Sequence, residues 1–145
     1  MAIHIEKATA ADLPALQLLY IQLCEEKIDL AKAAAVLHNM LAQENYHLLV
    51  ARESTGRAIG TAMGVLCLDL AYSCDPFMLI ENVVVLEEFR AAGVGKRLMD
   101  ELERIAQAAG CSLVMLVSGA ARESAHTFYK NLGYAEAKGF KKRYW

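Results

Sequence analysis

A glycine-containing segment between a strand and a helix constrains the fold of this chain more than any other feature of its sequence. Residues 77–86 end in three consecutive valines before a leucine, which predicts a strand that is apolar on both faces and covered by helices. Residues 93–109 carry apolar side chains at helical spacing and charged side chains opposite them, which predicts a strong amphipathic helix. The connecting segment therefore leads from a buried strand into the first turn of a helix.

This connecting segment has the composition of a phosphate-binding loop. The first amides of a helix lack internal acceptors, and the helix dipole adds partial positive charge there. Gly93 and Gly95 have no side chains that would keep a ligand from the backbone, and Arg90, Lys96 and Arg97 supply cations. The segment therefore predicts a cradle for a pyrophosphate group.

Two familiar phosphate-binding patterns fit the segment poorly. The dinucleotide fingerprint G-x-G-x-x-G requires a third glycine where Leu98 stands. The P-loop pattern matches Gly95-Lys96, but Arg90 replaces its first glycine and Arg97 replaces the hydroxyl residue that holds magnesium. From this segment alone, an ordinary glycine-containing loop with solvated charges remains an open interpretation.

The rest of the chain alternates between helical and extended patterns. Thr9 and Asp12 resemble a capping box, with Asp12 as an alternative N-cap, before a first amphipathic helix. A turn containing Gly56 between two apolar runs indicates a hairpin. We expect further strands at residues 3–5, 46–51, 58–70 and 112–117, further helices at 30–43 and 123–132, and one or two strands in the tail 134–145.

Composition narrows the class of protein. With 145 residues, 56% of them hydrophobic, the chain fits a single domain over 1–145 with a substantial core. A net charge of -2 disfavours nucleic acid as a partner. No long uncharged run suits a membrane span, and no apolar leader is visible, so we expect a cytoplasmic protein with free thiols at its four cysteines. The histidines lack ligand spacing, so we expect no metal.

Three matching motifs together carry a family resemblance. The segment from Arg90 to Gly95 reads R-x-x-G-x-G at a strand-to-helix junction. Residues 79–85, L-I-E-N-V-V-V, precede it, and A-x-x-F-Y-x-x-x-G-[FY] runs from Ala125 to Tyr134. This combination resembles the acetyl-CoA signature of the GNAT superfamily of N-acetyltransferases. Within that superfamily, it is most similar to small bacterial enzymes resembling glucosamine 6-phosphate N-acetyltransferase.

The resemblance implies a fold and a co-substrate. The implied fold is mixed α/β (α+β), with a mostly antiparallel central sheet of about six to seven strands flanked by about four helices. The implied co-substrate is acetyl-CoA, with its pantetheine arm paired with the strand at Val83 and Val85. The backbone amides around Val83 and Val84 would hold the oxyanion of the tetrahedral intermediate. Its remaining contacts would come from Arg90, Ala91, Ala92, Gly93, Val94, Gly95, Lys96 and Arg97 around the pyrophosphate, and from Ala125 and Phe128.

The resemblance also implies catalytic roles. Attack of a primary amine on a thioester needs a base, and Glu81 is the candidate because we expect desolvation in its apolar strand to disfavour the charged carboxylate. A solvent-facing or ion-paired Glu81 is the alternative. Tyr129 matches the general acid of the family, although a core tyrosine would look the same. Arg122 stands where many members carry an asparagine, which puts one side-chain contact in doubt.

The function that follows is acetyl transfer to a primary amine on a small molecule or a peptide. A non-catalytic acyl-CoA-binding sensor or regulatory module is the alternative, although such a module needs neither Glu81 nor Tyr129. The apolar run 61–68 and the aromatic tail offer more apolar surface than one small core covers. We therefore expect a homodimer that buries part of this surface.

Overall fold

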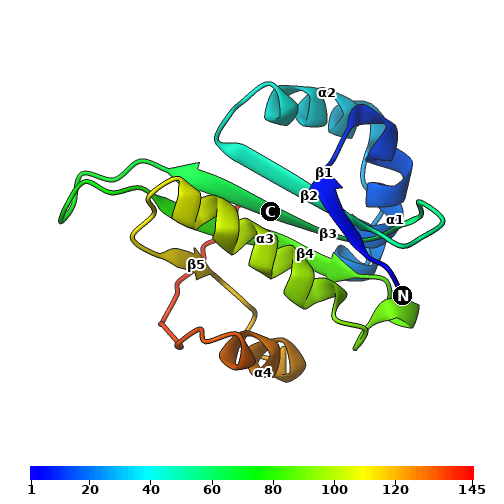
Figure 1. The fold of residues 1–145 in the computed structure, drawn as a ribbon. Coiled ribbons are helices and arrows are strands. Elements are labelled where there is room, and N and C mark those ends of the chain that lie inside the picture. Colours follow the sequence, from blue (N-terminus) through cyan, green and yellow to red (C-terminus); the bar gives the residue numbers. More distant parts are fainter. The chain divides into compact units, whose positions relative to one another are not determined.

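A computed structural model describes all residues, 1–145, and their contacts divide the chain into two compact units. The first unit spans Met1–Met115 and the second spans Leu116–Trp145. No helix combines the length and the apolar character that crossing a membrane requires. In the order of the sequence (Figure 1), the elements are β1 (His4–Lys7), η1 (Ala10–Asp12), α1 (Leu13–Cys24), α2 (Leu30–Leu41), β2 (Tyr46–Arg52), β3 (Ala58–Cys67), β4 (Phe77–Val85), η2 (Glu87–Phe89), α3 (Val94–Ala108), β5 (Val114–Leu116) and α4 (Glu123–Asn131).

The sheet has the strand order β1-β2-β3-β4-β5, and the first four strands pair antiparallel. Alternating side chains divide between its two faces. Leu48 and Val50 of β2 pack with Leu16 of α1 and Leu37 of α2 in one buried cluster. The other face is covered by α3, whose buried side chains are Val94, Leu98, Met99, Leu102 and Ala106. The predicted mixed α/β fold with four α-helices and a mostly antiparallel sheet is confirmed.

The start of α1 is fixed by a buried carboxylate. Asp12 is 5% exposed, and its carboxylate accepts hydrogen bonds from the Thr9 amide at 2.8 Å and from Arg52 Nη2 at 2.6 Å. Arg52 also pairs with Glu6 of β1. The predicted cap at Thr9 and Asp12 is therefore present, and it joins the start of the helix to the end of β2.

The strand count and the end of β3 differ from the sequence-based expectation. The sheet has five strands, not six or seven, because the tail after Tyr134 forms none. That tail is rich in charged side chains, and Phe140, Tyr144 and Trp145 are all about 90% exposed, so these aromatic side chains add little packing that would stabilise an extended pairing. β3 ends at Cys67 rather than at residue 70, since Leu68 and Leu70 are exposed.

β5 is shorter than the strand expected over residues 112–117. It spans only Val114–Leu116 and lies at the end of the strand order. Leu113, Met115 and Val117 are 49%, 45% and 59% exposed, as expected for a strand with one open edge. The four cysteines are free, as expected, and Cys24 and Cys74 are exposed.

Gly64 is required by the close approach of α3 to the sheet. A Cβ atom at this position would lie 2.8 Å from Leu102 Cδ2 and 2.8 Å from Met78 Sδ. We expect Gly64→Ala to lower the free energy of unfolding by about 1–3 kcal/mol, because overpacking forces these buried side chains to shift. Urea denaturation followed by circular dichroism measures the change. Leu102→Val in the same chain should relieve part of the clash, so strictly additive losses would contradict this explanation.

Candidate active site

A β-bulge interrupts β4 in the middle of its apolar run. Met63 of β3 pairs with Glu81, and Thr61 pairs with Val84, so one residue on β3 faces two on β4. Asn82, one of these two residues, has a φ of 57°, in the left-handed region that few residues adopt. This is the geometry of a β-bulge, which leaves backbone groups of the extra residue outside the ladder.

The bulge changes which face each side chain of β4 occupies. Residues directly opposite each other in an antiparallel pair share a face. Met63 packs against the cluster under α1 and α2, so its partner Glu81 lies on that face. Thr61 pairs with both Val50 and Val84, which places Val84 on the same face as Glu81 despite the two residues between them. Without the bulge, their spacing would put them on opposite faces.

Glu81 is exposed, whereas Val84 is 7% exposed. The expectation that the apolar strand desolvates the Glu81 carboxylate is therefore wrong. The reason is local, because Glu81 and Asn82 at the bulge both reach solvent while the residues on either side pack inward. Val83 and Val85 are half-buried.

Two residues of the predicted phosphate loop have a positive φ. Ala91 has a φ of 64° and Gly93 has a φ of 82°, and Gly93 is the N-cap of α3. No side chain caps the first turn of this helix. Its first amides therefore lack a side-chain acceptor, and Gly93 is the residue that can hold this backbone conformation without strain.

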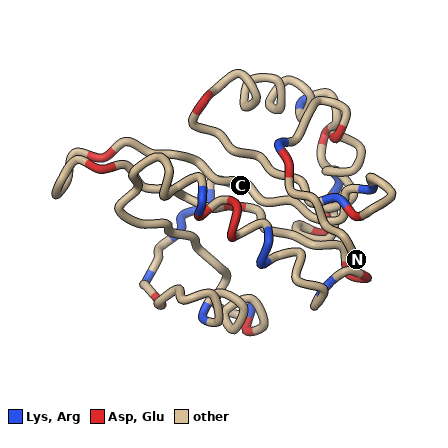
Figure 2. Tube along the Cα trace, viewed as in Figure 1, with Lys and Arg blue, Asp and Glu red and all other residues tan.

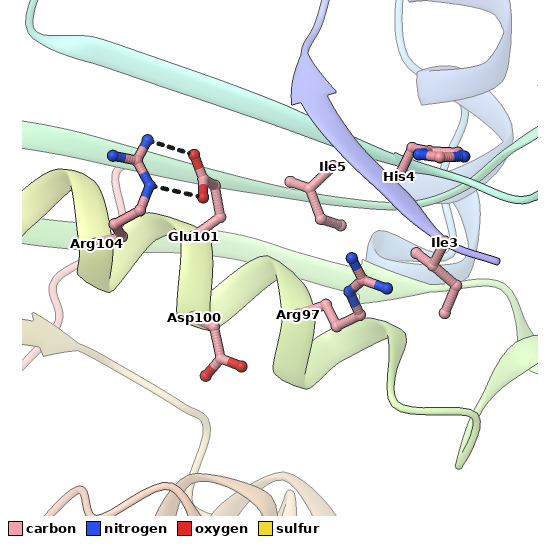
Figure 3. Close-up of a pocket in the computed structure, with 7 residues that line it drawn as sticks. All are labelled: Ile3, His4, Ile5, Arg97, Asp100, Glu101 and Arg104. Carbon is pink, nitrogen blue, oxygen red and sulfur yellow. Dashed lines mark hydrogen bonds and ion pairs between the residues drawn. The ribbon is translucent and has the colours of Figure 1, made fainter.

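The three cations of the loop point to different partners. Arg90 donates from Nε to the carbonyl oxygen of Val85 at 3.4 Å. Lys96 pairs with Asp100 at 2.6 Å. Arg97 lines a groove of about 440 Å³ beside Ile3 and the first two residues of β1, His4 and Ile5 (Figure 3). Only Arg90 is therefore bonded to the strand that leads into the loop.

The groove between β1 and α3 is balanced in charge. Arg104 donates two hydrogen bonds to Glu101, at 2.9 Å and 2.6 Å, and Asp100 projects from the same helix (Figure 3). Two arginines and two carboxylates line it in total. This balance gives the groove no preference for an anion, whereas the uncapped start of α3 has the free amides that suit a phosphate.

Tyr129 lies in the second unit, on α4, together with the other two predicted residues of that segment. Its ring makes edge contacts with Phe128 at 5.1 Å and with Tyr134 at 6.0 Å between centroids. Burial raises the pKa of Tyr129, an effect that the nearby Arg122 partly opposes. Ala125 lies one turn earlier and is half-buried. The phenol of Tyr129 is thus neutral across the physiological pH range.

Two residues near the bulge carry contacts that the sequence did not indicate. Gln22 of α1 accepts a hydrogen bond from the Glu87 amide at 3.1 Å and so ties α1 to the start of the phosphate loop. Tyr20 of α1 is hydrogen bonded to Thr61, whose hydroxyl donates to the Leu49 carbonyl at 2.7 Å. Thr61 is fully buried and opposite the end of the bulge. Only the pattern of an isolated threonine in an apolar strand hinted at this contact.

Comparisons with known proteins agree with this geometry. The model of the Acetyltransferase (GNAT) family matches residues 15–134. A candidate acetyltransferase from Agrobacterium tumefaciens str. C58 is 34% identical with a TM-score of 0.90, covering 97% of this chain and 99% of that chain. A transcriptional regulator from Bacillus halodurans C-125 is 22% identical with a TM-score of 0.92, covering 99% and 100%. Glucosamine-6-phosphate N-acetyltransferase from Arabidopsis thaliana is 20% identical with a TM-score of 0.86, covering 99% of both chains. No curated protein sequence matches the chain.

The chain therefore belongs to the GNAT family of acetyltransferases, and the predicted family is confirmed. The two structures that are less than 25% identical support the fold alone. Enzymes of this family use acetyl-CoA as the acetyl donor, and the uncapped start of α3 suits its pyrophosphate. No group of three or more His, Cys, Asp or Glu side chains is placed to hold a metal ion.

The positive φ of Asn82 gives a direct test of the bulge. A β-branched side chain in the left-handed region is costly, so we expect Asn82→Val to lower the free energy of unfolding by about 1–2 kcal/mol. Asn82→Gly should be close to neutral, since glycine adopts this conformation freely. Chemical denaturation of both variants measures the difference. If valine is tolerated as well as glycine, Asn82 does not hold a left-handed conformation in solution.

Proposed function

We propose that this protein transfers the acetyl group of acetyl-CoA to a primary amine by direct attack within a ternary complex. One observation carries the proposal: the bulge in β4 and the uncapped first turn of α3 are separated by a short loop of the same unit. The bulge offers unpaired backbone groups to amides, and the helix start offers free amides to an anion. A CoA thioester carries both kinds of group, with amides in its pantetheine arm and a pyrophosphate beyond them.

The donor-binding residues follow from this arrangement. The backbone of Val83 and Val85 would pair with the amides of the pantetheine arm, in the manner of an added strand. Backbone amides around Val83 and Val84 would stabilise the oxyanion of the tetrahedral intermediate. The pyrophosphate would lie at the start of α3 over Gly93 and Gly95, with Arg90 turning from the Val85 carbonyl to neutralise it. Ala125 and Phe128 of α4 would contact the pantetheine arm.

Glu81 is proposed as the base or as the anchor of a water that acts as base. Its exposed carboxylate lies on the face of the sheet under α1 and α2, where an amine has access. The neutral amine nitrogen attacks the thioester carbon, and a tetrahedral oxyanion forms. When the oxyanion collapses, the carbon–sulfur bond breaks. The ammonium proton of the adduct passes to Glu81, directly or through water.

Tyr129 is proposed as the acid that protonates the leaving thiolate. The thiol of CoA has an ordinary pKa near that of cysteine, about 8.5, so its thiolate leaves readily. Protonation by Tyr129 would therefore speed the departure of the thiolate without being required for it. Because burial raises the pKa of Tyr129, the phenol keeps its proton throughout the pH range in which the amine is active. The four unpaired cysteines suit a reducing compartment, so we also propose a cytoplasmic location.

If Glu81 is the base, its substitution should lower turnover and leave the affinity for acetyl-CoA unchanged. With an acceptor found by screening an amine panel for thiol release, Glu81→Gln should lower kcat about 100-fold at neutral pH, within the range for a general base. The Kd for acetyl-CoA should stay within about twofold, because the carboxylate contacts the amine and not the donor. Steady-state kinetics and calorimetric titration measure the two quantities.

Glu88→Gln is a matched control, since this exposed glutamate lies near the loop but pairs with Arg57. It should leave kcat unchanged. Turnover by Glu81→Gln equal to that of the unaltered protein would refute the base assignment alone. Tight acetyl-CoA binding with no thiol release for any amine would instead favour a non-catalytic sensor.

The acid assignment predicts a pH dependence. Tyr129→Phe should lower kcat about 10- to 100-fold, toward the low end for a general acid because the thiolate leaves easily. The raised pKa of Tyr129 means that the phenol is protonated below its ordinary pKa and loses its proton only at higher pH. The unaltered enzyme should therefore show no loss of kcat from this group up to about pH 9. A descending limb near neutral pH that Tyr129→Phe abolishes would contradict the assignment.

A further inference from the structure

Helices cover only part of the sheet face that carries Glu81. The Tyr20 side chain of α1 is hydrogen bonded to Thr61, and Gln22 of α1 accepts a hydrogen bond from the Glu87 amide. Both contacts lie at the end of β4 that leads into the predicted phosphate loop. Figure 1 shows α1 at this end of the sheet and the connection between β3 and β4 at the opposite end. The part of the face near that connection is therefore the part that α1 does not reach.

This uncovered part of the face is apolar. The register that places Glu81 opposite Met63 also places Leu79 opposite Val65, and residues that are opposite each other share a face. The residues that alternate with them on β4, Met78 and Ile80, are almost fully buried on the face that α3 covers. On the face of Glu81, the two strands instead present four half-buried, uncharged side chains, here called the apolar strip: Val65, Cys67, Phe77 and Leu79.

The apolar strip leads to a segment with large exposed apolar side chains. Residues 68–76, here called the β3–β4 arm, connect the two strands and project from the end of the sheet (Figure 1). Leu68, Leu70 and Tyr72 in this arm are 95%, 92% and 103% exposed. Surface apolar side chains are usually scattered, so three in one short segment mark an interaction surface.

The charged groups along this surface are all acidic. Asp69 and Asp75 are the only charged residues of the arm, and Figure 2 shows acidic and no basic positions there. A groove of about 600 Å³ lies at the base of the arm, and Val65 and Cys67 of the apolar strip line it together with Glu44. A ligand that fits this surface is therefore apolar and positively charged. A phosphorylated acceptor is disfavoured, because no basic side chain lines the groove or the arm to pair with a phosphate.

The distance from Glu81 to the arm requires an extended ligand. Phe77 begins β4 and lies four positions before Glu81. Because a strand rises about 3.3 Å per residue, roughly 13 Å separate Glu81 from the start of β4, and the arm lies beyond it. A small amine at Glu81 cannot reach the arm. An extended peptide covers the same distance with about four residues.

We propose that the acceptor is a peptide segment with apolar and basic residues beside its reacting amine, and that the apolar strip and the β3–β4 arm bind this segment. The inference rests on the proposed acetyl transfer and names the class of its acceptor. The reacting amine lies at Glu81, apolar side chains of the peptide cover Leu70 and Tyr72, and its basic side chains lie beside the two aspartates of the arm. The peptide nitrogen gains the acetyl group and loses one proton, and CoA leaves as its thiol.

Defined peptides test the proposal with the full-length protein. The first has a blocked N-terminus and a central lysine, with about six residues of alternating leucine and arginine on each side, enough to reach the arm in either direction. Its kcat/KM, measured by thiol release, should exceed that of Nα-acetyl-lysine methylamide at least about tenfold. Glutamate in place of arginine should abolish this advantage, because the peptide then meets acidic groups of like charge.

A second peptide distinguishes the two sources of a primary amine. It has a free N-terminus followed by the same alternating leucine and arginine residues, and it contains no lysine. Mass spectrometry identifies the acetylated nitrogen in each product. Acetylation of the lysine peptide indicates a side-chain acceptor, and acetylation of the second peptide indicates a terminal one. Either result supports a peptide acceptor if the kcat/KM exceeds that of the lysine amide by the expected factor.

Two arm variants should raise KM for the basic peptide and leave its kcat unchanged, because neither touches the reacting atoms. Asp69→Asn with Asp75→Asn removes two charges, and the asparagine oxygen still accepts the hydrogen bond from the Ala71 amide. This variant should raise KM about threefold to tenfold. Leu70→Ser with Tyr72→Ser removes the exposed apolar contact and should raise KM about tenfold.

The matched control is Glu88→Gln with Glu136→Gln, which removes two exposed charges outside the arm. It should leave KM for the basic peptide within about twofold of that of the unaltered protein. For the lysine amide, all three variants should keep kcat and KM within about twofold, since this substrate does not reach the arm. A variant that had lost its fold would fail this measurement, and circular dichroism checks the fold independently.

Equal kcat/KM for the basic peptides and the lysine amide overturns the proposal, and so does a peptide KM that both arm variants leave unchanged. If no amine gives thiol release, the proposed acetyl transfer fails instead. Fluorescence anisotropy of the labelled basic peptide then tests the surface itself. Binding that the arm variants weaken and the control does not supports the surface. No binding, or equal binding by all variants, overturns it.

Discussion

The bulge in β4 is the constraint on which the proposed active site depends. An unbroken strand would alternate its side chains strictly, and a residue three positions after Glu81 would then face α3. The extra residue at Asn82 and Val83 shifts this alternation, so that Val84 packs under α1 and α2 while Val85 pairs with Gly60 on the face that α3 covers. The same shift in the alternation of side chains leaves Glu81 exposed to solvent. A single left-handed residue thus separates the proposed base from the core and frees backbone groups beside it.

The packing of α3 determines where the predicted phosphate loop lies. Gly60 and Gly64 of β3 let this helix approach closely, since a Cβ at Gly60 would lie 3.0 Å from Val94 Cγ1. Val94 is the first residue of α3 and is almost fully buried. The start of the helix is therefore held against the sheet, and the positive φ of Gly93 turns the chain into it. The free amides of the first turn are positioned by core packing rather than by contacts within the loop.

The sequence could predict those parts of the fold that repeat a local pattern. Helical spacing of apolar residues identified the amphipathic face of α3, and R-x-x-G-x-G identified the loop before it, because both are properties of neighbouring residues. The bulge was not predictable in this way. Asn82 within L-I-E-N-V-V-V reads as one polar residue in an ordinary strand, and only pairing with β3 shows that two residues face one. The exposure of Glu81 and the open edge of β5 escaped prediction for the same reason, since both depend on which strands lie alongside.

Arg90 links the two halves of the proposed donor site. Its Nε lies 3.4 Å from the Val85 carbonyl, longer than a good hydrogen bond, so this contact costs little to break. A pyrophosphate at the start of α3 would attract the guanidinium more strongly than a neutral carbonyl does, because a charge-assisted bond is about twice as strong as a neutral one. Movement of Arg90 toward the phosphates would then free the Val85 carbonyl for the pantetheine arm. Binding at the helix start would thereby favour pairing along the strand, so the two proposed contacts to one CoA molecule would reinforce each other.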